Sequence, residues 1–121
     1  MLIVDAANVV GSRPDGWWRD RPGAARRLIE QIAGAVEEGA VEDEAVVVVL
    51  EGRARAGAAE QPSGPVRVVH AQGEGDDTIA DLASDASAGC TVVTADRGLV
   101  ERVRAAGAEV VGPRWLLDRL G

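Results

Sequence analysis

The sequence contains no lysine, because all thirteen of its basic residues are arginine. This absence disfavours a P-loop ATPase, a receiver-type phosphoacceptor and a Schiff-base enzyme, each of which needs a lysine side chain at its reacting centre. A phosphatase of the haloacid-dehalogenase type also needs a lysine, and it needs a second aspartate two residues after the first. Position 7, two residues after Asp5, is Ala7.

Cysteine and aromatic residues are scarce as well. Cys90 is the single cysteine, so the chain cannot form an internal disulfide. We find no secretory leader and no apolar span of eighteen residues, and we therefore expect a soluble cytoplasmic protein with no membrane partner. Only 2% of the residues are aromatic although 46% are hydrophobic, so valine, alanine and leucine must supply the core. Cys90 and Trp115 are expected to be core residues.

Short apolar runs alternate with helix-like segments along the chain. The runs predict five strands at residues 1–5, 45–50, 66–70, 90–94 and 109–111. Helices are predicted from about 21 to 38, 76 to 88, 97 to 106 and from 113 onward, with a short one around 54–60 and a loop over 9–21. This alternation predicts a single domain over residues 1–121, with a three-layer α/β fold and a mainly parallel five-stranded sheet flanked by helices.

Aspartates follow three of the predicted strands. Asp5 ends the first strand, Asp76 and Asp77 follow the third, and Asp96 follows the fourth. Parallel strands bring their carboxyl ends to one sheet edge, where crowded carboxylates are unfavourable unless a cation neutralises them. Carboxylate and water oxygens suit Mg²⁺ or Mn²⁺, so we predict a metal site there. The alternatives are that Asp5 bonds the backbone of the next segment and that Asp76 and Asp96 cap helices.

Helical phase ranks the two adjacent aspartates. If Ile79 and Leu82 face the sheet, Asp76 falls near that face, whereas Asp77 shares the opposite side with Asp81. Asp76 is the better aimed of the pair. Asp77 stays a candidate ligand or water-positioning group, because the first turn of a helix is poorly defined by phase.

Three segments carry a family resemblance. Asp5-Ala-Ala-Asn8 resembles the D-x-x-N signature at the first strand of the NYN branch of PIN-like ribonucleases, and Gly75-Asp76-Asp77 resembles the acidic pair that opens their middle helix. The segment from Thr94 to Asp96 is similar to the family's S/T-x-D motif. The resemblance spans almost the whole chain and is strongest to the YacP-like group of small bacterial members. It implies a PIN-like fold with strand order 3-2-1-4-5 and Mg²⁺- or Mn²⁺-dependent cleavage of RNA. At Ala6-Ala7 relatives often have glycine and an aromatic residue, so a substrate contact is in doubt there.

Metal-assisted hydrolysis is the reaction expected of such a site. Asp5, Asp76 and Asp96 would be ligands of a cation that polarises the phosphoryl oxygens and lowers the pKa of a water. Asn8 would orient that water or a phosphate oxygen, or else would only shape its loop. Thr94 would orient a ligand through its hydroxyl. We expect an endonuclease, with exonucleolytic action left open.

Substrate contacts are expected around the same edge. The formal net charge of −7 argues against binding RNA over the whole surface, but arginines gather in the segments that follow strands. The candidates for phosphate binding are Arg13, Arg19, Arg53, Arg55 and Arg97, and Arg21 lies among them. Trp17 or Trp18 would stack an unpaired base, or would only anchor its loop. We interpret His70 as a structural residue rather than a catalytic base, although its place at the end of the third strand keeps the second role open.

The main alternative is a non-catalytic PIN-like module that binds RNA or protein through its arginines. The retained acidic positions argue against it, since clustered repulsive charge has no use in an inactive module. A phosphotransfer or signalling domain is a distant third hypothesis. The sequence leaves open a homo-oligomer, a ribonucleoprotein partner and the identity of the RNA.

Overall fold

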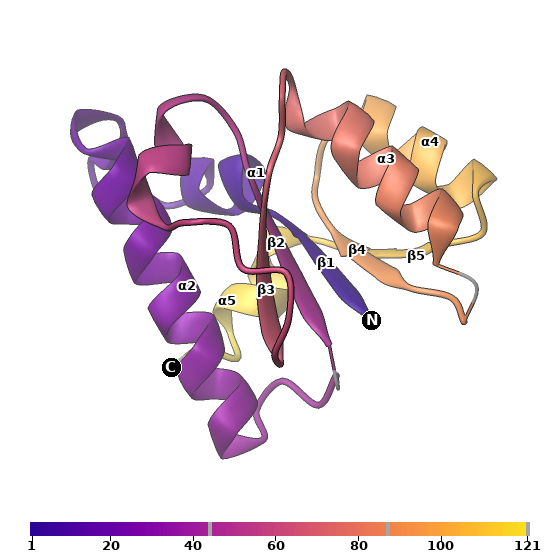
Figure 1. Ribbon diagram of the computed structural model, residues 1–121, viewed down its shortest axis with the longest axis horizontal. Coiled ribbons are helices and arrows are strands. Elements are labelled where there is room, and N and C mark those ends of the chain that lie inside the picture. The colour runs from indigo at the N-terminus through magenta and orange to yellow at the C-terminus, as the bar shows by residue number, and fades with distance from the viewer. Residues whose placement is uncertain (44, 87, 121) are drawn as a thin grey trace.

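A five-stranded sheet with order β3-β2-β1-β4-β5 forms the centre of the chain (Figure 1). The computed structural model describes residues 1–43, 45–86 and 88–120. The strands are β1 (Leu2–Asp5), β2 (Val46–Leu50), β3 (Val66–His70), β4 (Thr91–Val93) and β5 (Glu109–Val111). All four neighbouring pairs are parallel, which confirms the predicted strand order and the α/β fold with a parallel sheet. An isolated antiparallel bridge joins Gln61 to Val68.

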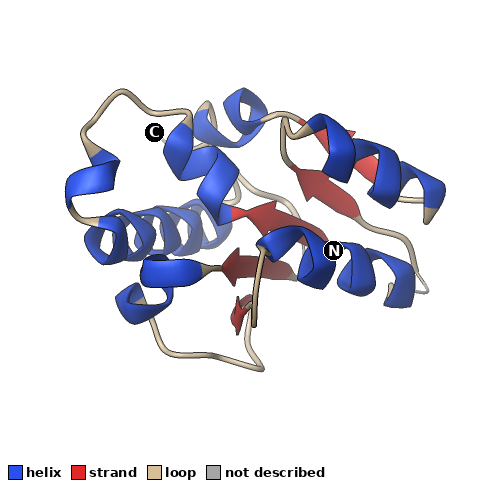
Figure 2. Ribbon diagram, turned by 90° about the horizontal axis from the view of Figure 1, so that it is seen from above, coloured by secondary structure: helices blue, strands red, loops and turns tan. Residues whose placement is uncertain are grey.

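Helices cover both faces of this sheet. They are α1 (Ala6–Gly11), α2 (Arg21–Glu38), α3 (Gly75–Asp85), α4 (Arg97–Ala105) and α5 (Pro113–Leu117), with 3-10 turns η1 (Trp17–Arg19) and η2 (Gly52–Gly57). Helices α1, α2 and α5 lie on one side, and α3 and α4 lie on the other (Figures 1 and 2). The three-layer prediction is therefore confirmed. Among the described helices, none has the length and apolar character needed to cross a membrane.

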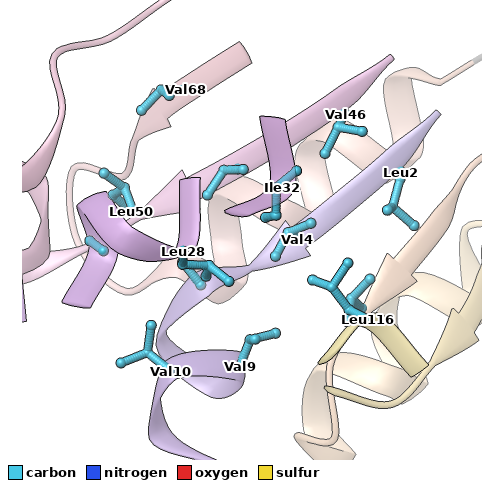
Figure 3. Close-up of a cluster of buried hydrophobic side chains, with 14 of the residues drawn as sticks. Leu2, Val4, Val9, Val10, Leu28, Ile32, Val46, Leu50, Val68 and Leu116 are labelled. Carbon is cyan, nitrogen blue, oxygen red and sulfur yellow. The ribbon is translucent and has the colours of Figure 1, made fainter. Parts of the chain in front are cut away.

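Side chains of the central strands alternate between two cores. Leu2 and Val4 pack with α1, α2 and α5 on one face, whereas Ile3 packs with α3 and α4 on the other. Successive residues of a strand point to opposite faces, so one apolar run serves both layers. Figure 3 shows Leu28 and Ile32 of α2 over the first face. The valine-rich core is as predicted, with Cys90 buried and Trp115 partly buried against it.

Local signals delimit the longest helix as predicted. The Asp20 carboxylate accepts a hydrogen bond from Gly23 N at 2.9 Å, Pro22 lies in the first turn, and Gly39 ends the helix at φ 81°. Turn η2 approaches α2 closely, because a Cβ at Gly57 would collide with the carbonyl oxygen of Pro22. Glycine at position 57 thus brings the segment after β2 against α2.

Some predicted boundaries are wrong. The segment predicted as a loop over 9–21 contains the end of α1 and the turn η1. Six residues are too few for a helical repeat to be recognised, but Asp5 caps α1 and its Val9 and Val10 are buried. The short helix predicted around 54–60 is instead a 3-10 turn at Gly52–Gly57. Helix α3 ends at Asp85 rather than near residue 88, and Ser87 lies outside the described residues.

Candidate active site

Asp5 lies at the carboxyl end of the central strand and is 5% exposed. Its Oδ2 accepts a hydrogen bond from Thr94 Oγ1 at 2.9 Å, and its Oδ1 accepts one from Asn8 N at 3.4 Å. The pKa of Asp5 is raised to about 6, mainly by burial and also by the charges of Asp76 and Glu51, while the two hydrogen bonds act to lower it. The alternative that Asp5 bonds the backbone of the next segment is thus observed. Asp5 also lies near other carboxylates.

Thr94 connects Asp5 to Asp96. The buried Thr94 hydroxyl donates to Asp5, and its oxygen accepts a hydrogen bond from Asp96 N at 3.1 Å. Asp96 in turn caps α4, because its Oδ1 accepts from Leu99 N at 2.9 Å. The capping alternative for Asp96 is therefore confirmed. Because β1 and β4 are neighbours in the sheet, this chain of hydrogen bonds fixes the two aspartates relative to each other.

Asn8 also bridges β1 and β4. Its Oδ1 accepts a hydrogen bond from Ala95 N at 2.8 Å, which ties α1 to the segment between β4 and α4. This contact corresponds to the loop-shaping alternative. The role predicted for Asn8 toward a water or a phosphate oxygen stays a prediction.

The two adjacent aspartates of α3 point in different directions. Asp76 is half-buried, and burial raises its pKa, with further contributions from the charges of Asp96, Glu51 and Glu74. Asp77 is 80% exposed, and its Oδ1 lies 2.9 Å from Arg102 Nη1 of α4. The capping role considered for Asp76 is wrong, because the residue that precedes α3 is Glu74 and Asp76 lies within the first turn. Asp76 is less exposed than Asp77, as the helical phase predicted. Which of the two would hold a cation stays a prediction.

Glu51 is a site residue that sequence reasoning missed. It follows β2 directly, its charge raises the pKa of both Asp5 and Asp76, and its Oε2 accepts a hydrogen bond from Gly75 N at 3.1 Å. A Cβ at Gly75 would lie 3.2 Å from Glu51 Oε1, so glycine lets the start of α3 approach this carboxylate. The signal was present, because Glu51 comes directly after the apolar run of β2, as an acidic residue at the carboxyl end of a strand.

Asp5, Glu51, Asp76 and Asp96 form what we call the acidic centre. Its donors are all carboxylate oxygens, the ligand type that Mg²⁺ and Mn²⁺ prefer, and burial together with neighbouring negative charges raises the pKa of Asp5 and Asp76. The donor set therefore fits a hard divalent cation. Yet, within the described ranges, no three acidic, histidine or cysteine side chains lie close enough to hold a metal ion as they stand. Asp5 and Asp96 face protein donors instead, so a ready-made triad is not seen.

The fold of this chain is similar to that of solved structures. No family model matches the sequence, and no curated protein does. Solved structures do match. The chain shares its fold with Rae1 (YacP) from Bacillus subtilis. The match to Rae1 has a TM-score of 0.74 at 22% identity and covers 99% of this chain and 72% of that one. A W164L mutant of Rae1 matches with a TM-score of 0.72, also at 22% identity, covering 98% and 73%.

Because the match to Rae1 covers 99% of the chain, the strands and helices that carry the acidic centre belong to the shared fold. An identity of 22% is too low to transfer individual side chains. The roles of residues must therefore come from the geometry of this chain.

Tryptophans and arginines gather beside the acidic centre around η1 and the start of α2. The Trp17 and Trp18 rings meet edge to face, with centroids 6.0 Å apart. Arg21 lies over the Trp17 ring at 5.3 Å, and Arg19 lies over the Trp18 ring at 5.8 Å. Trp18 is 56% exposed, whereas Trp17 packs against the core. The anchoring alternative therefore describes Trp17 better than Trp18.

The remaining candidate arginines differ in their contacts. Arg55 holds its own segment, because Nε donates to Gly52 O at 3.0 Å and Nη1 donates to Ala71 O at 3.4 Å. Arg53 and Arg97 are exposed. Arg13 shares a hollow of about 510 Å³ with Ala95 and Arg114, an arginine that sequence reasoning missed.

The His70 ring contacts Ala58 O through Nε2 at 2.7 Å. Its backbone N–H donates to the Glu60 side chain at 2.8 Å. Both contacts hold the segment between η2 and β3 against the edge strand. They agree with the structural interpretation of His70.

Proposed function

We propose that the protein is a divalent-cation-dependent ribonuclease that hydrolyses RNA phosphodiester bonds within the strand. The observation that carries the proposal is the acidic centre at the carboxyl edge of a parallel sheet, where burial and the charges of carboxylates from separate elements raise the pKa of Asp5 and of Asp76. The resemblance of three segments to NYN and PIN-like ribonucleases supports the same activity. The fold shared with Rae1 supports the architecture.

Asp5, Asp76 and Asp96 would hold the cation, with Glu51 beside them. When bound, the cation supplies Lewis-acid stabilisation of charge on the phosphoryl group and makes a water more acidic. The protein's own part is to aim the carboxylates. Thr94 fixes Asp5 and the backbone of Asp96, and Glu51 fixes the start of α3.

Burial of Asp5 keeps bulk water from its carboxylate. Because the pKa of Asp5 is about 6, the group is ionised above that pH, and a cation that prefers the ionised form would lower this pKa. In the presence of the cation, cleavage should therefore rise with pH below about 6 and should be fully developed above it. Exposed Arg53 and Arg97 would hold flanking phosphates.

The test is cleavage of structured and unstructured RNA with Mn²⁺, with Mg²⁺ and with chelator. We expect cleavage only with cation, giving 5′-phosphate and 3′-hydroxyl ends, and a loss of roughly 10²–10³ in rate for Asp5→Asn and Asp96→Asn. Asp85→Asn, at an exposed position of α3, is the matched control and should cut normally. Cation-independent cleavage, or 2′,3′-cyclic phosphate products, would reject the mechanism.

A non-catalytic RNA-binding module is the second candidate. One observation favours it: over the described residues, the carboxylates are not positioned to hold a metal ion as they stand. In that case the parent protein binds RNA without cutting it under any cation condition. Asp5→Asn would then change RNA affinity alone.

A further inference from the structure

A hollow of about 300 Å³ lies beside the acidic centre, between α1, η1, the start of α2 and η2. Its wall is mostly apolar and is lined by Ala6, Ala7, Val10, Trp17, Ala25 and Ala54. Small alanine side chains from α1, α2 and η2 leave the space open. A volume of this size is at the lower end of sites for small molecules, and it suits one planar group rather than a base pair.

Planar groups form part of that wall. Trp17 and Arg21 both line the hollow, and the guanidinium carbon of Arg21 lies 5.3 Å from the centroid of the Trp17 ring. Trp17 packs against the core and lies perpendicular to the Trp18 ring, so its own ring is held in place before any ligand arrives. Unpaired bases stack on indole and guanidinium planes, and a preordered partner reduces the entropy lost on binding.

Glu51 joins the hollow to the acidic centre. Glu51 is one of the residues that line the hollow, and its Oε2 accepts the hydrogen bond from Gly75 N at the start of α3. A nucleotide whose phosphate lies at the acidic centre therefore has its base within reach of the hollow. A carboxylate oxygen in the wall can accept a hydrogen bond from an exocyclic amino group, which cytosine has and uracil lacks.

We propose that this hollow binds one unpaired nucleobase of an RNA strand, stacked on Trp17 and Arg21, with a preference for amino-bearing bases set by Glu51. The proposal rests on the proposed function, because RNA is the ligand. It adds to that function a subsite for the nucleotide next to the cleaved bond. Exposed Trp18 lies outside the hollow and is not part of the subsite.

The test is a titration of ¹⁵N-labelled protein with cytidine and uridine 5′-monophosphates, followed by NMR. We expect the indole N–H of Trp17, assigned with Trp17→Phe, and the amide of Gly52 to shift, and uridine monophosphate to bind about fivefold more weakly. Ala7→Leu fills the hollow from the exposed side of α1 and should abolish both shifts. Ala54→Leu does the same from η2, should the first variant fold poorly. Ala33→Leu, at an exposed position of α2, is the control.

Shifts confined to Trp18, or shifts that persist in both filled variants, would overturn the subsite. Equal affinity for the two nucleotides would overturn the role of Glu51. The titration needs no turnover, so the two proposals fail separately. Base binding by a protein that cuts no RNA rejects the ribonuclease, whereas cleavage without any shift at Trp17 rejects the subsite.

Discussion

Asp5 affects both the stability of the fold and the proposed function. It is buried at the end of the central strand, where its charge is unfavourable, yet it accepts hydrogen bonds from both Thr94 and the Asn8 backbone. A carboxylate in this position weakens the cation-free fold and favours a bound cation. Under the proposed function, the acid at position 5 would serve cation binding rather than stability.

The raised pKa of Asp5 predicts a pH-dependent effect of Asp5→Asn. Burial raises this pKa from 3.8 to about 6, so the folded protein holds the proton to higher pH than the unfolded chain. The stabilising contribution of Asp5 is complete below about pH 4 and is lost as the pH rises through about 6. Without metal, the stability of Asp5→Asn relative to the parent should rise by roughly 2 kcal/mol between pH 4 and pH 8.

Urea unfolding of both proteins across this pH range measures the difference. The free energy of unfolding of Asp85→Asn should change with pH as that of the parent does, since Asp85 is exposed on α3. If the free energy of unfolding of Asp5→Asn also changed with pH as that of the parent does, Asp5 would not be a buried acid with a raised pKa. Failure of Asp5→Asn to fold at any pH would show that the two hydrogen bonds outweigh the charge.

At the scale of elements, helix α3 presents one aspartate to the acidic centre and one to α4. Asp76 faces other carboxylates, whereas Asp77 pairs with Arg102 at 2.9 Å on the surface. We expect Asp76→Asn to lower the cleavage rate by roughly 10²–10³ and Asp77→Asn by less than about tenfold. Single-turnover rates with saturating Mn²⁺ measure both. Similar large losses in the two variants would mean that Asp77 turns toward the substrate and that its pair with Arg102 breaks.

Two arginines in the segment after β2 differ in their contacts. Arg53 is exposed, whereas Arg55 donates hydrogen bonds to two backbone carbonyls of its surroundings. Arg53→Ala should weaken RNA binding and make its salt dependence shallower by about one counterion, because one phosphate contact is lost. Arg104→Ala, at the far end of α4, is the matched control. An unchanged salt slope in Arg53→Ala would place the RNA path elsewhere.

At the scale of the whole molecule, the acidic centre joins elements that are distant in the chain. It takes residues from β1, from the segment after β2, from α3 and from the start of α4. A cation bound there would link both halves of the sheet. Cation binding should thus stabilise the fold as a unit.

Melting in Mn²⁺ tests this expectation. At one hundred times the dissociation constant, binding adds about 2.7 kcal/mol, which corresponds to a rise of roughly 10 °C in Tm for a chain of this size. The rise should be lost in Asp5→Asn and kept in Asp85→Asn. An unchanged Tm of the parent protein in millimolar Mn²⁺ would argue against a cation at the acidic centre.

Local chemistry was enough to predict much of this molecule. Apolar runs located the five strands, capping residues located α2, and strand-end aspartates located the acidic edge. These signals are readable because backbone periodicity and capping depend on residues within one turn or one strand. Shared strand direction then brings Asp5 and Asp96 to the same edge without knowledge of any side-chain contact.

Only the tertiary structure decided how the side chains at that edge are used. The hydrogen bond from Thr94 to Asp5 joins residues 89 positions apart, and Glu51 enters the acidic centre through its bond to Gly75. The hollow lined by Trp17 exists because α1, α2 and η2 converge there. The sequence determined which groups reach the edge, since strand ends are local. Packing between distant elements decided their partners, since rotamer and burial depend on neighbours that no local pattern specifies.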